Sequence, residues 1–277
     1  MKTIFLTGGN GFIGRHIKEY FINKYHIFAP SSSELDLTNS NALKSFKQIK
    51  HIDFIIHSAS YGITQHTTNI CQKNILMYEN LKNIMSSDTK MISFGSGAQY
   101  NRMQNLHKIK ESDFSKSIPK DEYGLSKYYI LRDIMDSNNI ISLNLFGCFG
   151  KYEIKKRFIS YCLFCALSNK PIEINENSTF SFLDVEDLCD ILEILLDNFP
   201  SEKSINITPD EAYSMEEIAI KIQKIHYVDY RISKEGKIYT GDNSLLKTIL
   251  PNVKFRDLES GIKKLYNYYK ILYNSTL

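Results

Sequence analysis

Three residues of this chain, Ser96, Tyr123 and Lys127, have types and spacing suited to proton transfer. Tyr123 and Lys127 lie four positions apart, so on a helix they would share one face. A free phenol ionises near pH 10, but a nearby ammonium group favours the phenolate and so suits a phenol to general acid or base catalysis. Ser96 follows an apolar run, and its hydroxyl could hydrogen-bond a substrate oxygen. Although the Tyr–Lys spacing alone is also common among surface neighbours, the three residues together predict a catalytic site.

A second candidate site is the glycine-rich segment TGGNGFIG (7–14), which directly follows the apolar run Thr3–Leu6. Glycines allow a tight turn there, and a pyrophosphate could approach the free N–H groups at the start of the following helix. This placement predicts a dinucleotide-binding turn. The contacts expected from it are Gly8, Gly11, Phe12, Ile13 and Gly14.

Short apolar runs alternate with amphipathic segments over the first 150 residues. The runs are Thr3–Leu6, His26–Ala29, Phe54–His57, Met91–Phe94 and Ile140–Phe146. This alternation predicts an α/β fold with a doubly wound, Rossmann-type parallel sheet. After residue 150 the pattern loosens, with helices expected near 157–168, 185–195 and 258–273 and strands near 172–174 and 205–207. We expect 1–150 to form a dinucleotide-binding domain and 151–277 a smaller mixed α/β substrate lobe, with some segments returning to the Rossmann core.

Composition narrows the function class. The 277 residues carry 34 basic and 31 acidic side chains with no long run of one sign, so we expect no nucleic-acid partner. The chain starts without a signal-like segment, and no window approaches the roughly 18 apolar residues of a membrane span, so we expect a cytoplasmic protein without a membrane partner. Cys162 and Cys165 form a CxxC inside an apolar run, which favours two core cysteines on one helix face over a metal site.

Taken together, these motifs resemble the extended short-chain dehydrogenases/reductases, specifically their sugar-nucleotide epimerase, dehydratase and reductase group. The glycine turn is similar to the family's cofactor turn, and Ser96, Tyr123 and Lys127 are similar to its catalytic triad. The segments HSA (57–59) and FLDVEDL (182–188) are similar to family segments beside the cofactor and the sugar nucleotide. The resemblance covers nearly the whole chain.

The resemblance implies an NAD(P) cofactor, a nucleotide-sugar substrate and a homodimer formed through the helix bearing Tyr123 and the one around residues 70–86. Two positions depart from the family pattern: Gly147 stands where the family often has Asn, and Phe180 where it often has Arg. Further cofactor contacts are expected at Ser31, Ser32, Asp36, Leu37, Ser58, Ala59, Tyr123 and Lys127. Substrate contacts are expected at Ser96, Gly97, Tyr123 and Arg157.

The segment PSSSELDL (30–37) bears on the cofactor and the reaction. No carboxylate precedes Glu34, and the serine hydroxyls with nearby Arg15 would tolerate a 2′-phosphate, so NADP(H) is favoured over NAD(H), although an ordinary polar turn would look the same. The segment resembles that of 4-keto reductases more than that of 4,6-dehydratases, whose acidic pair is missing beside Ser96. We expect reduction of a nucleotide-linked 4-keto-6-deoxy sugar, with the proton from Tyr123. A 4-epimerase that retains NAD and a non-catalytic dinucleotide-sensing regulator are the alternatives.

Overall fold

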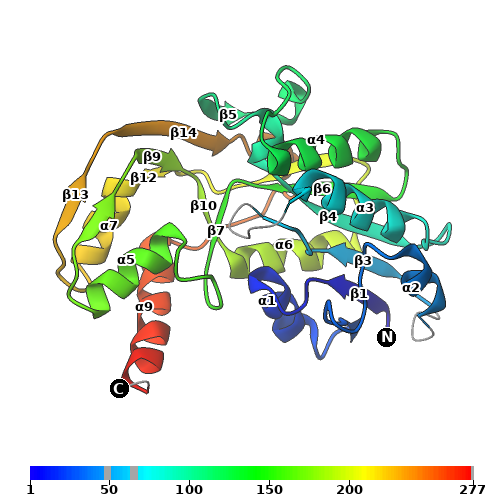
Figure 1. The fold of residues 1–277 in the computed structure, drawn as a ribbon, viewed down its shortest axis with the longest axis horizontal. Coiled ribbons are helices and arrows are strands. Elements are labelled where there is room, and N and C mark those ends of the chain that lie inside the picture. The colour runs from blue at the N-terminus through cyan, green and yellow to red at the C-terminus, as the bar shows by residue number, and fades with distance from the viewer. Residues whose placement is uncertain (47–50, 63–67, 276–277) are drawn as a thin grey trace.

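The structure is a computed structural model that describes residues 1–46, 51–62 and 68–275. Its largest element is a six-stranded sheet in the order β11-β6-β4-β3-β1-β2, in which all neighbours are parallel (Figure 1). The doubly wound parallel sheet predicted from the sequence is confirmed. Its strands are β1 (Thr3–Thr7), β2 (His26–Phe28), β3 (Phe54–His57), β4 (Lys90–Ser96), β6 (Ile140–Leu145) and β11 (Ser204–Ile207).

Helices cover both faces of this sheet because the strand side chains alternate between them. In β1, Ile4 and Leu6 join one hydrophobic core and Phe5 joins the other. The first core is closed by α1 (Phe12–Phe21) and α6 (Val185–Asp197). The second core, on the opposite face, is closed by α3 (Ile70–Lys82) and α4 (Glu122–Met135), together with α2 (Ser40–Ser45).

A smaller lobe, on the left in Figure 1, packs beside the carboxyl ends of the central strands. Its main sheet has the order β12-β9-β14-β5, and two strand pairs, β10-β7 and β13-β8, complete it. The strands are β5 (Leu106–Ile109), β7 (Gly147–Phe149), β8 (Ile172–Ile174), β9 (Asn177–Phe180), β10 (Phe182–Asp184), β12 (Tyr213–Ser214), β13 (Tyr230–Ile232) and β14 (Glu235–Gly241).

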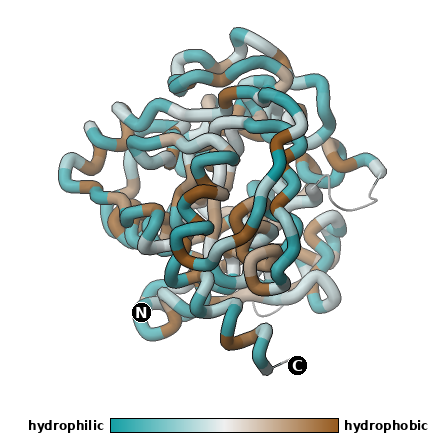
Figure 2. The backbone as a smooth tube through the Cα atoms, turned by 90° about the vertical axis from the view of Figure 1, so that its left-hand side faces the viewer, coloured by the Kyte–Doolittle hydropathy of each residue, from teal (hydrophilic) through white to brown (hydrophobic). Residues whose placement is uncertain are grey.

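Three helices form the core of the small lobe: α5 (Phe158–Leu167), α7 (Met215–Gln223) and α9 (Leu258–Asn274). Figure 2 looks onto this lobe and shows hydrophobic and hydrophilic segments alternating along the chain, as amphipathic helices require. Cys162 and Cys165 are both buried in its core. Within the described ranges, no helix combines the length and apolar character needed to cross a membrane.

The chain passes between the lobes more than once. The strand β11 pairs with β6 in the six-stranded sheet, and the helix α8 (Ser244–Ile249) packs on the same core, although both follow residue 151. In the opposite direction, β5 leaves the first 150 residues to pair with β14 in the small lobe. The boundary at residue 150 therefore stays a prediction, since strands of both halves share one sheet.

The turn between β1 and α1 depends on close backbone packing. Gly8 has a φ of +68°, which a glycine adopts without strain. The N–H of Gly11 donates to the carbonyl oxygen of Gly8 at 2.9 Å. A Cβ on Gly14 would lie 2.1 Å from that same carbonyl oxygen, so no side chain fits at this point of the helix.

We therefore expect Gly14→Ala to lower the free energy of unfolding by about 2 kcal/mol, even though alanine is the better helix former, because the backbone of the turn must shift. Urea denaturation monitored by circular dichroism measures this. Gly62→Ala is the control, since a Cβ there meets no atom of the described residues within 4 Å. Equal stability of the two variants would contradict the packing role of Gly14.

Candidate active site

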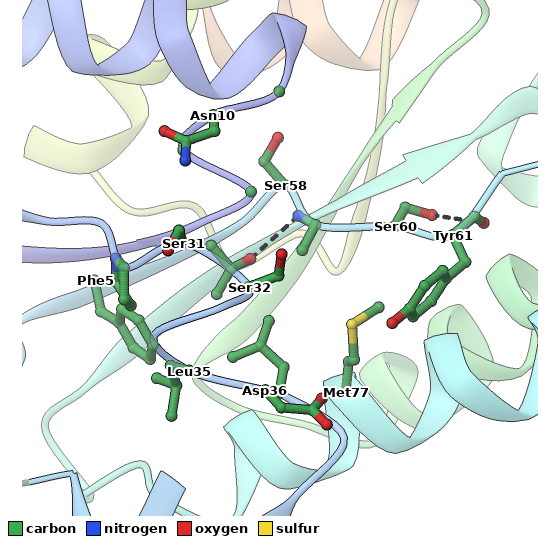
Figure 3. Close-up of a pocket in the computed structure, with 17 residues that line it drawn as sticks. Phe5, Asn10, Ser31, Ser32, Leu35, Asp36, Ser58, Ser60, Tyr61 and Met77 are labelled. Atoms are coloured by element: carbon green, nitrogen blue, oxygen red, sulfur yellow. Dashed lines mark hydrogen bonds between the residues drawn. The ribbon is translucent and has the colours of Figure 1, made fainter. Parts of the chain in front are cut away.

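A cavity of about 340 Å³ opens at the carboxyl ends of β1, β2 and β3 (Figure 3). The chain moves to opposite sides of β1 to form β2 and β3, so the cavity lies at the topological switch point where open α/β sheets bind ligands. Its lining is Phe5, Thr7, Gly8, Gly9, Asn10, Gly11, Pro30, Ser31, Ser32, Leu35, Asp36, Leu37, Ser58, Ala59, Ser60, Tyr61 and Met77.

Most of the residues expected to contact the cofactor line this cavity. They are Gly8, Gly11, Ser31, Ser32, Asp36, Leu37, Ser58 and Ala59. Phe12, Ile13 and Gly14 form the first turn of α1 and do not line it, and Tyr123 and Lys127 lie outside it as well. Sequence reasoning missed Asn10, Tyr61 and Met77, the last of which comes from α3 with no local signal for a binding role.

Two hydrogen bonds to the side chain of Thr7 connect the strand ends β1 and β3 beneath the cavity. Thr7 Oγ1 lies 2.8 Å from Nδ1 of His57 and also accepts the N–H of Ala59 at 3.2 Å. Burial and the ammonium group of Lys127 lower the pKa of His57 to about 3, so this imidazole is neutral at physiological pH. These bonds hold the ends of β1 and β3 in register, and the glycine turn approaches them closely.

The polar side of the cavity is formed by the turn after β2. Glu34 accepts hydrogen bonds from both the N–H and the hydroxyl of Ser31, each at 2.7 Å, and these bonds lower the pKa of its carboxyl group. Arg15 lies next to the cavity: its Nε donates to the carbonyl of Asn10, which lines the cavity, and its guanidinium lies 5.2 Å from the ring centre of Tyr152. A contact of Arg15 with a 2′-phosphate stays a prediction.

Ser96 is held rigidly at the end of β4. It caps the short 3-10 helix η1 (Gly97–Tyr100), where its Oγ accepts the N–H of Ala98 at 3.2 Å. The side chain of Gln99 closes a capping box on the Ser96 backbone N–H. The strand end therefore presents one hydroxyl in a fixed place, as predicted for this position.

Tyr123 and Lys127 lie in the first two turns of α4. This helix begins where Asp121 accepts the N–H of Gly124 at 2.9 Å. It packs directly against η1, because a Cβ on Gly124 would come within 2.8 Å of the carbonyl oxygen of Ala98. The helix start and the Ser96 turn are therefore neighbours in space.

Lys127 carries a buried ammonium group. Its side chain donates to the carbonyl oxygen of Phe94 at 2.7 Å and lies 5.7 Å from the ring centre of Tyr123. Burial lowers the pKa of Lys127, and the phenol of Tyr123 partly opposes this shift. A positive charge next to the phenol stabilises a phenolate, which is what proton donation by Tyr123 would require.

A second phenol reaches the same place from the small lobe. The hydroxyl of Tyr239, in β14, lies 3.3 Å from Ser96 Oγ. Burial raises the pKa of Tyr239, and the nearby phenol of Tyr123 raises it further, so this group is a neutral phenol. Tyr239 lies 143 residues from Ser96 in the chain, and no sequence motif indicated it.

The remaining substrate candidate, Arg157, lines a second cavity of about 130 Å³. This cavity lies between the strands β7, β9 and β10 and the start of α5. Gly147 and Phe180, the two positions that depart from the family pattern, line the same cavity. Arg157 Nε lies 3.5 Å from the carboxylate of the buried Glu153. An aromatic wall with one guanidinium group suits a nucleotide base and its phosphate.

The match to known families decides the classification. Residues 4–208 match the family described as "NAD dependent epimerase/dehydratase family". The chain belongs to this family. The membership confirms the resemblance drawn from the motifs, and the enzyme class expected from the sequence, an NAD(P)-dependent oxidoreductase or epimerase of sugar nucleotides, is that of the family.

Individual relatives of this epimerase/dehydratase chain have low sequence identity to it, but the alignments cover nearly the full length of both proteins. It is 26% identical to a GDP-L-colitose synthase of Yersinia pseudotuberculosis, covering 96% of this chain and 97% of the relative. It is 24% identical to a GDP-6-deoxy-D-talose 4-dehydrogenase of Aggregatibacter actinomycetemcomitans, covering 95% and 96%. The crystal structure of a GDP-L-fucose synthetase from Naegleria fowleri bound to NADP superposes with a TM-score of 0.83 at 17% identity, covering 99% and 94%.

The buried Glu153 gives the site a measurable pH signature. Its carboxyl group accepts the hydroxyl of Ser160 at 2.6 Å, and burial raises its pKa to about 7. Because the folded-state pKa exceeds the unfolded one, the folded protein binds the extra proton, and the stability this contributes is lost as pH rises from about 4.5 to about 7.

We expect the stability of the wild type relative to Glu153→Gln to fall by roughly 3 kcal/mol between pH 4.5 and 7.5. Urea unfolding at several pH values measures the difference, and the exposed Glu235→Gln provides the control. A wild-type to Glu153→Gln difference that does not change with pH would show that Glu153 is not a buried acid.

Proposed function

We propose that this chain is an NADP(H)-dependent reductase of a GDP-linked 4-keto-6-deoxy sugar. The observation that carries the proposal is that the start of α4, with Tyr123 beside the buried ammonium group of Lys127, packs on the turn that begins at Ser96. This turn lies at the same edge of the sheet as the cavity that the glycine turn lines. The hydroxyl of Ser96 and the ammonium group of Lys127 are each held by a hydrogen bond to the backbone, and the Lys127 and Arg102 cations lie beside the Tyr123 ring. The site would therefore be preorganised before substrate arrives, which is the arrangement that stabilises a developing oxyanion.

In this proposal each residue has one task. A bound nicotinamide cofactor supplies the hydride. Ser96 donates a hydrogen bond to the keto oxygen, and Tyr123 transfers its proton to that oxygen as negative charge develops there. Lys127 stabilises the phenolate left on Tyr123, since its ammonium group lies beside the ring and has little access to water.

Two observations support the proposed substrate class. The relatives named above are a GDP-L-colitose synthase and a GDP-6-deoxy-D-talose 4-dehydrogenase, both of which carry a GDP-linked sugar in their names. The cavity beside Arg157 offers an aromatic wall for a base and a cation for phosphate. We infer that the nucleotide part of the substrate occupies this cavity and the sugar extends toward Ser96.

The turn after β2 supports NADP(H) over NAD(H). Ser31 and Ser32 line the cavity with hydroxyl groups. Glu34, the first acid after β2, is bonded back to Ser31 and does not line the cavity, whereas Asp36, two residues further on, does. A solved relative is bound to NADP. Hydroxyl donors are compatible with a 2′-phosphate, and a ribose-gripping carboxylate is not.

Isothermal titration of the purified protein should therefore show tighter binding of NADPH than of NADH. Ser32→Ala should bring the two dissociation constants closer together, because it removes a cavity hydroxyl that can donate to the 2′-phosphate, whereas the Ser31 hydroxyl already donates to Glu34. Tighter binding of NADH would overturn the cofactor assignment while leaving the reaction class intact.

Tyr123→Phe tests the proton donor. We expect the variant to bind NADPH with a dissociation constant within about twofold of the wild type and to lose at least about 100-fold in kcat, the usual range for removal of a general acid. Tyr129→Phe, on the exposed face of the same helix, is the matched control and should retain full turnover. Near wild-type turnover in Tyr123→Phe would exclude the proton-transfer role.

The stoichiometry of the reaction separates this proposal from its alternatives. A reductase consumes one NADPH for each product formed from a GDP-4-keto-6-deoxy sugar, which absorbance at the nicotinamide band measures. A 4-epimerase would form product with no net consumption. A dinucleotide-sensing regulator would bind NADPH but would convert none of the GDP-4-keto-6-deoxy sugars supplied to it.

A further inference from the structure

The hydroxyl of Tyr239 contacts the end of β4 from a different lobe. It lies 3.3 Å from Ser96 Oγ, and a Cβ on Gly97 would come within 2.7 Å of it. The Tyr239 ring is held by two aromatic neighbours, Phe146 at 5.4 Å and Phe180 at 5.1 Å between ring centres. Packing therefore fixes the phenol beside Ser96, the residue proposed to bind the substrate's keto oxygen.

The number of hydrogen bonds that Ser96 can make bears on which hydroxyl of the Ser96–Tyr239 pair is the donor. A serine hydroxyl has one donor and two acceptor sites. The N–H of Ala98 occupies one acceptor site at 3.2 Å. If Tyr239 donates to the other, both acceptor sites are filled, and the single proton of Ser96 must point to a third group.

Tyr239 is the better donor of the pair. A phenolic O–H is more acidic than an aliphatic one, and burial keeps the phenol of Tyr239 protonated at neutral pH. The 3.3 Å separation is long for two hydroxyl groups, and such contacts commonly tighten when substrate closes the site. The open direction around Ser96 is then the one toward the substrate.

We propose that Tyr239 is a positioning residue that donates its hydrogen bond to Ser96 and so directs the Ser96 hydroxyl proton to the keto oxygen of the substrate. This inference rests on the proposed reductase function. The strand β14 of the small lobe thereby takes part in catalysis, because its pairing with β5 and β9 determines where the phenol of Tyr239 lies.

A double-mutant cycle with Ser96→Ala and Tyr239→Phe tests the coupling, using NADPH and a GDP-4-keto-6-deoxy sugar. Tyr239→Phe keeps the ring and its aromatic packing. We expect it to lower kcat about tenfold, with the KM for the sugar nucleotide and the dissociation constant of NADPH within about twofold of the wild type. In the Ser96→Ala background the same change should lower kcat by less than about twofold, because the group it acts through is already gone.

Tyr213→Phe, in β12 of the same sheet, is the control and should leave kcat unchanged. Wild-type kcat in Tyr239→Phe, or an equal fold-loss in both backgrounds, would overturn the positioning role while leaving the reductase proposal intact. Absence of turnover by the wild type with every GDP-keto sugar would overturn both.

Discussion

The buried ammonium group of Lys127 is the constraint around which the site is arranged. A lysine with 6% of its surface exposed is costly unless its charge is compensated. Here a carbonyl of β4 accepts its hydrogen bond, and the Tyr123 ring lies beside it. The compensation ties α4 to the central strand of the sheet. The same interaction that stabilises the buried charge therefore fixes the position of the phenol relative to the strand that ends in Ser96.

The two lobes contribute different parts of the candidate site. The large lobe supplies the glycine turn and the polar cavity at the ends of its first three strands, the position at which open α/β sheets bind ligands. The small lobe supplies the aromatic cavity beside Arg157 and, through β14, the phenol of Tyr239. Because β5 joins the small-lobe sheet directly after the Ser96 turn, the lobes are linked at the place where the chemistry is proposed.

Local signals were sufficient to predict most of the large lobe. The strands of the parallel sheet followed from apolar runs, and the Gly8 turn and the Tyr123–Lys127 pair each lie within one short segment. Tyr239 could not be found in this way, since its contact with Ser96 depends on the register of β14 with β9 and β5. The direction of Arg15 was also beyond the sequence, because it is set by stacking on Tyr152, far along the chain.

The central claim, that the carbonyl carbon of a bound sugar receives hydride in front of Tyr123, is tested most directly by isotope transfer. The wild-type protein would be incubated with NADPH in which both hydrogens at C4 of the nicotinamide are replaced by deuterium, together with a GDP-4-keto-6-deoxy sugar, and the product analysed by mass spectrometry and NMR. The account predicts one deuterium on the product, located at C4 of the sugar. A product without deuterium, or with deuterium at another carbon, would contradict it.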